Sequence, residues 1–163
     1  MSGSTTKKVL LERFDREPMR GFVNPQSCFA ESGVELLSPD GSLATIPYAQ
    51  LKTVCFVRDL QGPPLSAERH EFLTRPKAAG LWVELTFRDG DRLQGMLPNN
   101  LLLIEPFGYS LTPPEASGNT QRVFVPRAAV RELKVLGVVG APRRGAHPTK
   151  PTPETQIKLF SED

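Results

Sequence analysis

An internal repeat is the feature of this sequence that most constrains its fold. Three blocks recur in the same order in both halves of the chain: residues 9–23 align with 83–97, residues 33–39 with 108–114, and residues 44–57 with 123–136. The first pair of blocks aligns without a gap. Several ordered blocks are stronger evidence of a repeat than one match, so the chain is predicted to contain two copies of a unit of roughly 50 to 60 residues.

Each copy has the pattern of short antiparallel β-strands. Residues 81–87, LWVELTF, combine β-branched and aromatic residues with alternating polar positions. The RDGD that follows contains Asp89 and Gly90, a dipeptide that is a strong hairpin signal. Residues 92–97 are therefore the return strand, in which Gly95, like the aligned Gly21 of the first copy, marks a bulge or a sharp bend.

The remaining elements of the second copy follow from the same reasoning. Residues 101–114 are expected to supply a third strand, residues 121–126 a fourth and residues 129–139 a fifth. Pro47 and Pro126 each precede a short run of polar and apolar residues, which predicts a single helical turn before the last strand of each copy.

These elements predict an all-β fold of two tandem small β-barrels. The first repeat spans residues 7–58 and the second residues 81–139. Between them, residues 59–80 form a linker with a possible short helix. Residues 140–163 are expected to be a flexible tail, because four prolines and no large aliphatic residue lie within residues 141–155.

Two resemblances bear on this fold. The hairpin at residues 83–97 resembles the opening hairpin of Sm-like barrels, which implies an Sm-like or SH3-like barrel for each repeat. The short arginine-glycine loop with which those proteins bind RNA has no counterpart in this sequence. More broadly, most of residues 7–138 resembles an uncharacterised bacterial family of two-repeat β proteins, a domain of unknown function, and that resemblance implies no activity.

The composition narrows the class of protein and its compartment. The net charge is only +2, so binding of nucleic acid by electrostatic attraction alone would require a local basic patch. No apolar run reaches the roughly 20 residues of a membrane span, and the N-terminus lacks a signal-peptide pattern, so a cytoplasmic protein is expected. Cys28 and Cys55 lie among apolar neighbours, which predicts buried free thiols in preference to a disulfide.

Catalytic chemistry is poorly supported. His70 and His147 lie in a charged linker and in the tail, where surface histidines are expected. Asp89 and Asp91 flank the hairpin glycine, and turn chemistry accounts for them better than a metal site or an acid–base pair does. The sequence therefore predicts no catalytic residues, no metal and no cofactor, and a protein that is not an enzyme.

The C-terminal QIKLF carries the leading functional hypothesis. It resembles the linear motif by which bacterial DNA polymerases, mismatch-repair proteins and other replication factors dock on the β sliding clamp. The resemblance assigns Gln156 to the polar position, Ile157 to the aliphatic position, and Leu159 with Phe160 to the apolar cleft. It implies an adaptor linked to DNA replication or repair. Two alternatives stay open for the same residues: a terminal strand on the protein's own sheet, or a different partner that binds a peptide in a groove.

A second hypothesis concerns ligand binding by the barrels. Arg16 and Arg20 have the arginine spacing of PilZ barrels that bind cyclic di-GMP, although the second half of that motif is not convincingly matched. The repeat alignment places both at the first hairpin turn, where two solvated arginines are the better account. The alternative function is therefore a nucleotide-sensing or RNA-binding β-barrel. The body is also a candidate to contact DNA or a second protein, and the sequence does not predict the oligomeric state.

Overall fold

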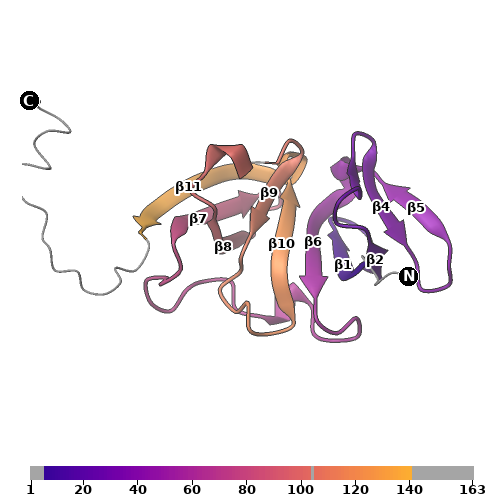
Figure 1. Cartoon of the computed structure of the whole chain (residues 1–163), viewed down its shortest axis with the longest axis horizontal. Helices are drawn as coiled ribbons and strands as arrows, with labels where there is room; N and C mark the ends of the chain where they lie inside the picture. Colours follow the sequence, from indigo (N-terminus) through magenta and orange to yellow (C-terminus); the bar gives the residue numbers. More distant parts are fainter. Residues whose placement is uncertain (1–5, 104, 141–163) are drawn as a thin grey trace, which may run out of the picture.

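The computed structural model describes residues 6–103 and 105–140, and within them the chain is all-β, as predicted (Figure 1). The first half contains β1 (Lys7–Arg13), β2 (Met19–Val23), β3 (Phe29–Ala30), β4 (Gly33–Leu37), β5 (Leu43–Ile46), the one-turn helix η1 (Tyr48–Gln50) and β6 (Leu51–Val57). The second part contains η2 (Leu65–Ala67), β7 (Gly80–Phe87), β8 (Arg92–Leu97), η3 (Leu101–Leu103), β9 (Gly108–Leu111), β10 (Thr120–Pro126), η4 (Arg127–Ala129) and β11 (Val130–Val139).

The strands form two antiparallel sheets. The larger has the order β3-β4-β2-β1-β6-β10-β9, with β5 paired to β4, and the smaller has the order β11-β7-β8. A single bridge between Met96 and Thr112 links β8 to the chain just after β9. The larger sheet thus runs from one half of the molecule into the other through the pairing of β6 with β10 (Figure 1).

Aligned residues of the two halves occupy corresponding places in the pairing. Val9 lies opposite Phe56, and the aligned Val83 lies opposite Val135. The β6 strand has a bulge that leaves Lys52 without an opposite residue on β1, and the β11 strand has one at the aligned Arg131. The pairing of β1 with β2 and β6 in the first half thus has the same order as the pairing of β7 with β8 and β11 in the second.

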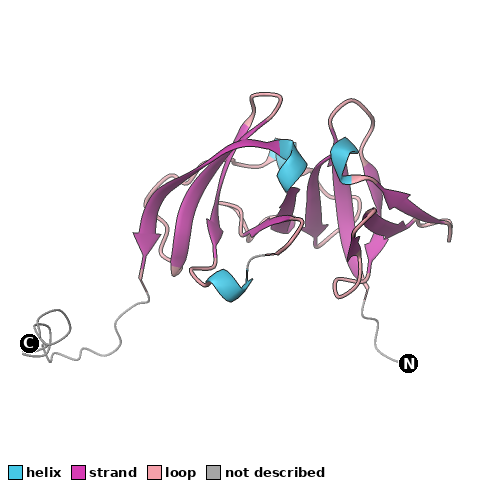
Figure 2. Ribbon diagram, turned by 90° about the horizontal axis from the view of Figure 1, so that it is seen from above, coloured by secondary structure: helices cyan, strands magenta, loops and turns pink. Residues whose placement is uncertain are grey.

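The predicted turns are confirmed. Gly90 has a φ of +97° in the turn that joins β7 to β8, a conformation in which glycine is favoured. The one-turn helices η1 and η4 begin directly after Pro47 and Pro126, as predicted (Figure 2). A Cβ on Gly21 would collide with the carbonyl oxygen of Leu37, so this glycine permits the close approach of β2 to β4.

The prediction of a third strand over residues 101–114 is wrong in its bounds. Only residues 108–111 form β9, and Leu101–Leu103 form the one-turn helix η3. The Asn100 side chain explains the difference, because its Oδ1 accepts a hydrogen bond from the backbone N–H of Leu102 at 3.0 Å. Such an Asx turn offers the backbone an alternative to a β-ladder.

The two halves share their hydrophobic cores through β6 and β10. The Phe124 ring, on β10, is buried in the cluster of the first half, where it stacks on Phe29 at 4.1 Å. Cys55 and Val57, on β6, are buried in the cluster of the second half. Because both strands are covered on both faces, they read in sequence as nearly continuous apolar runs.

The segment between β6 and β7 packs against the second half. Leu65, in η2, is buried in the core of that half. The side chain of Asn119 accepts a hydrogen bond from the backbone N–H of Asp59 at 2.9 Å and donates one to the Pro63 carbonyl at 3.0 Å. The Glu68 carboxylate accepts a bond from the Asn119 backbone at 2.8 Å. These bonds hold residues 59–68 against the β9–β10 loop.

Cys28 and Cys55 are free and buried, as predicted. Burial raises the pKa of the Cys28 thiol to about 11, and burial also raises the pKa of Cys55. Both thiols are therefore protonated and unreactive near neutral pH. Separately, none of the helices within the described residues has the length and apolar character needed to cross a membrane.

Candidate functional site

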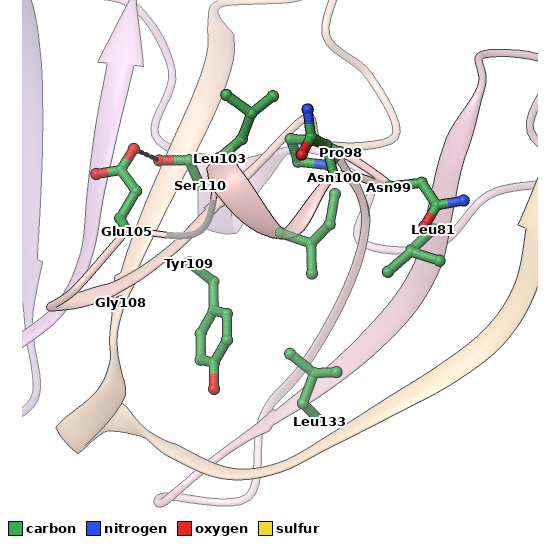
Figure 3. A pocket seen from close by; sticks show the side chains of 11 residues that line it. Leu81, Pro98, Asn99, Asn100, Leu103, Glu105, Gly108, Tyr109, Ser110 and Leu133 are labelled. Atoms are coloured by element: carbon green, nitrogen blue, oxygen red, sulfur yellow. Dashed lines mark hydrogen bonds between the residues drawn. The ribbon is translucent and has the colours of Figure 1, made fainter.

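An apolar cavity of about 210 Å³ opens in the second half of the molecule (Figure 3). Its apolar wall comes from Leu81 on β7, Leu97 on β8, Tyr109 on β9 and Leu133 on β11. The loop from Pro98 to Glu105 closes one side and carries Leu103 into the lining. Figure 3 shows Tyr109 and Leu133 projecting into the same space from different strands. We refer to this cavity as the β11 groove.

The loop beside the β11 groove presents leucines to solvent. Leu102 is 91% exposed and Leu103 is 58% exposed. The turn that holds them is fixed by Asn100, whose carbonyl oxygen accepts the backbone N–H of Leu103 at 2.9 Å. Exposed leucines at the mouth of an apolar cavity are typical of a surface that binds another chain or an apolar ligand.

Ser110 and Tyr109, two polar residues at the rim, are hydrogen-bonded within the protein. Ser110 Oγ donates a hydrogen bond to Glu105 Oε2 at 2.9 Å. The hydroxyl of Tyr109 accepts one from Arg127 Nη1 at 3.0 Å, and that guanidinium lies 5.1 Å from the Tyr109 ring centroid. Because these side chains bond one another, the groove can select an occupant mainly by its shape and apolar area.

A second cavity of about 520 Å³ continues from the β11 groove. The two share Leu97, Pro98, Leu103, Glu105 and Ser110, and the second extends to Arg122 on β10. The combined depression is therefore larger than a single side chain requires.

The acidic pair at the β7–β8 turn has a structural role. Lys52 Nζ, on β6, lies 2.8 Å from Asp89 Oδ2 and also contacts Asp91 Oδ2. Burial opposes the charge on Lys52, but the hydrogen bonds and charges of the two carboxylates outweigh it and raise the pKa of Lys52. The lysine thus compensates both carboxylates and connects the two halves. The described residues hold no group of three or more His, Cys, Asp or Glu side chains arranged for a metal ion.

The two arginines of the cyclic di-GMP hypothesis lie in different environments. Arg16 is exposed in the β1–β2 connection, whereas Arg20, on β2, is half-buried. Arg20 Nη1 donates a hydrogen bond to the carbonyl oxygen of Leu60. One of the two guanidiniums is thus already bonded to the backbone of the segment between β6 and β7.

The other predicted site residues fall as follows. Gln156, Ile157, Leu159 and Phe160 lie outside the described residues, as does His147. His70 is half-buried instead of lying free on the surface, and its Nε2 is 2.9 Å from the carbonyl oxygen of Leu65. The reason is that the chain around His70 follows the edge of β8, where the Gln94 N–H donates to the His70 carbonyl at 2.8 Å.

Sequence reasoning did not identify the β11 groove. Its lining comes from four strands and one loop, and the apolar residues among them, taken one at a time, look like ordinary core residues. One signal was available: the run Leu101-Leu102-Leu103 has no polar alternation, which is atypical of a half-exposed strand.

Comparisons with known proteins identify one family. Residues 5–137 match the model of a family described as a family of unknown function, DUF6982. No curated protein and no solved structure matches the chain.

Proposed function

The chain belongs to the DUF6982 family, whose function is unknown, and we propose that it is a non-enzymatic adaptor that docks on the bacterial DNA polymerase β sliding clamp. The observation that carries the proposal is the C-terminal sequence Gln156-Ile157-Lys158-Leu159-Phe160. It has the polar, aliphatic, variable, leucine and phenylalanine order of clamp-binding peptides. The adaptor would serve DNA replication or repair.

The energetics of such docking are favourable. Leu159 and Phe160 are adjacent large apolar side chains, and burying both in a preformed groove contributes roughly 3 to 5 kcal/mol from apolar area. The proline-rich residues before the motif favour an extended chain of roughly 3 Å per residue. A motif on such a tether can reach a partner while the body of the protein holds a second one.

For the body, we propose that the two halves are tandem copies of one small Sm-like or SH3-like β-barrel. Support comes from the recurrence of the registers, from the aligned bulges at Lys52 and Arg131, and from the one-turn helix before the last strand of each half. In the adaptor the body would contact DNA or a second protein.

Binding of a synthetic peptide of residues 150–163 to purified sliding clamp tests the docking proposal. We expect a micromolar Kd, which corresponds to about −8 kcal/mol. Changing Leu159 and Phe160 to alanine should abolish binding, whereas Lys158→Ala, at the variable position, should leave the Kd unchanged. Failure of the unmodified peptide to bind would remove the proposal.

A nucleotide-sensing barrel is the alternative that the Arg16 and Arg20 spacing suggests. We place it second because Arg20 already donates to the Leu60 carbonyl. A thermal shift with cyclic di-GMP that disappears in Arg16→Ala would reverse this order.

A further inference from the structure

The strand β11 is an edge strand with apolar side chains on its surface. Among the described residues it pairs with β7 on one side, and no strand pairs with its other side. Val135 is 51% exposed and Val138 is 56% exposed. A long edge strand of this kind is a template for pairing with a further strand, and proteins commonly cover such edges.

The aligned strand in the first half is covered. β6 pairs with β1 on one side and with β10 on the other, and both pairings are antiparallel. In the second pairing Phe124 lies opposite Val54. The Phe124 side chain is fully buried in the first half, in one cluster with Val23, Val34 and Val54.

The β11 groove lies at the corresponding place in the second half. Leu97, Tyr109 and Leu133 line it, and they align with Val23, Val34 and Val54. In the first half those three valines belong to the same buried cluster as Phe124, which the second half supplies. In the second half the aligned residues surround a cavity beside an unpaired strand edge. The site therefore has the features of an acceptor for one antiparallel strand with a large apolar side chain opposite Leu133.

The C-terminal segment of the chain fits these requirements. The strand β10 brings Arg122-Val123-Phe124 to β6, and the C-terminus carries the similar order Lys158-Leu159-Phe160. The antiparallel direction also fits. The chain leaves the C-terminal end of β11, so a later segment that returns along the edge of β11 runs antiparallel to it. With Phe160 opposite Leu133, residues from 140 to about 153 make the return, which is ample for a strand connection.

We propose that residues 158–160 pair with the free edge of β11 and that Phe160 fills the β11 groove. In this arrangement residues 158–160 cover the edge of β11 as β10 covers the edge of β6, and Phe160 takes the place that Phe124 has in the first half. It does not depend on sliding-clamp binding, although it would compete with that binding for Leu159 and Phe160.

A nitroxide label in the full-length chain tests the contact. Ser161→Cys carries the label next to Phe160, and the buried Cys28 and Cys55 stay unlabelled because their thiols are inaccessible. We expect the label to broaden the NMR signals of Tyr109 and Leu133. Adding Phe160→Ala should remove the broadening. The matched change Leu159→Ala should retain it, because the neighbouring side chain of a strand points to the opposite face.

Hydrogen exchange on the unlabelled full-length protein gives an independent reading. Phe160→Ala should speed exchange of the outward-facing β11 amides by about tenfold or more, because the covering strand is lost. No broadening of Tyr109 and Leu133 in the labelled protein would overturn the proposal. Broadening of unlabelled, isotope-enriched protein by a labelled second copy would also overturn it, since the occupant would then come from another chain.

Discussion

Gly21 shows how the absence of a side chain lets two strands of this fold approach closely. At this position β2 passes so close to β4 that a Cβ would meet the Leu37 carbonyl. Gly95, aligned with it, has a looser surrounding, with Leu111 Cβ and the Thr112 carbonyl oxygen at 3.1 Å. The two glycines therefore permit the same crossing with different tolerances.

Gly21→Ala should destabilise the protein by about 1 to 3 kcal/mol, since backbone must shift to admit the methyl group. Gly95→Ala should cost less, because its neighbours need to move by only a few tenths of an ångström. Gly140→Ala is the control, as nothing lies within 4 Å of its added Cβ. Urea midpoints measure the order. Equal loss at Gly21 and Gly140 would contradict the close approach.

Thr120 offers a stabilising change at the same scale. Its side chain is fully buried, and its hydroxyl is the one buried side-chain oxygen or nitrogen among the described residues without a hydrogen-bond partner. Replacing that hydroxyl by a methyl group removes a desolvation cost, so Thr120→Val should raise the free energy of unfolding by about 1 kcal/mol. The partnered Thr53, whose hydroxyl donates to Glu12 at 2.9 Å, is the control, and Thr53→Val should destabilise.

The contact of Lys52 with Asp89 and Asp91 predicts a dependence of stability on pH. Burial raises the pKa of Asp89, but its bonds with Lys52 and the backbone outweigh that and lower it. A lowered folded-state pKa gives stability that is present above the unfolded pKa of about 3.9 and is lost as pH falls through the folded pKa. Asp89 is 39% exposed, so we expect a loss below about 1 kcal/mol.

Unfolding in urea at several pH values measures this loss. Lys52→Met should remove the part of the acid-induced loss that belongs to the ion pair. An unchanged pH profile in that variant would show that the contact contributes no stability.

At the scale of elements, β10 is the strand on which both halves depend. Its Phe124 is buried against the first half, while Val123 and Val125 are buried in the second. Phe124→Ala should therefore cost about 3 to 5 kcal/mol, as for a large cavity in a core. Trp82, the only tryptophan, reports on the second half, and far-UV circular dichroism reports on both. Both probes should shift together. A loss confined to the circular dichroism signal would show that the halves unfold independently.

The sequence predicts local elements better than contacts between the halves. The hairpin at Gly90 and the helical turns after Pro47 and Pro126 are confirmed because each is specified by a residue with a restricted backbone preference. The pairing of β6 with β10 joins strands far apart in the chain, and hydrophobic alternation within one strand carries no information about which strand lies beside it. The β11 groove was not predicted for the same reason, since its lining comes from strands far apart in the sequence.

At the scale of the whole molecule, the proposals of clamp docking and of self-docking concern the same C-terminal residues. The same residues, Leu159 and Phe160, are proposed to dock on the sliding clamp and, in the free protein, to lie at the β11 edge. A segment held in one place binds elsewhere with an apparent affinity reduced by the fraction of time it is free. Self-docking would therefore regulate the adaptor without any change in the body.

This gives the last prediction. If self-docking holds the segment about nine-tenths of the time, full-length protein should bind the clamp about tenfold more weakly than the peptide of residues 150–163. Leu133→Asp places a charge in the β11 groove, and it should restore the affinity of the full chain to that of the peptide. Calorimetric titration of clamp with the three molecules measures this. Equal affinity of peptide and full-length protein would leave clamp docking intact but contradict the self-docked state. Absence of binding by all three would instead remove clamp docking, while the nitroxide experiment would still decide the self-docked state on its own.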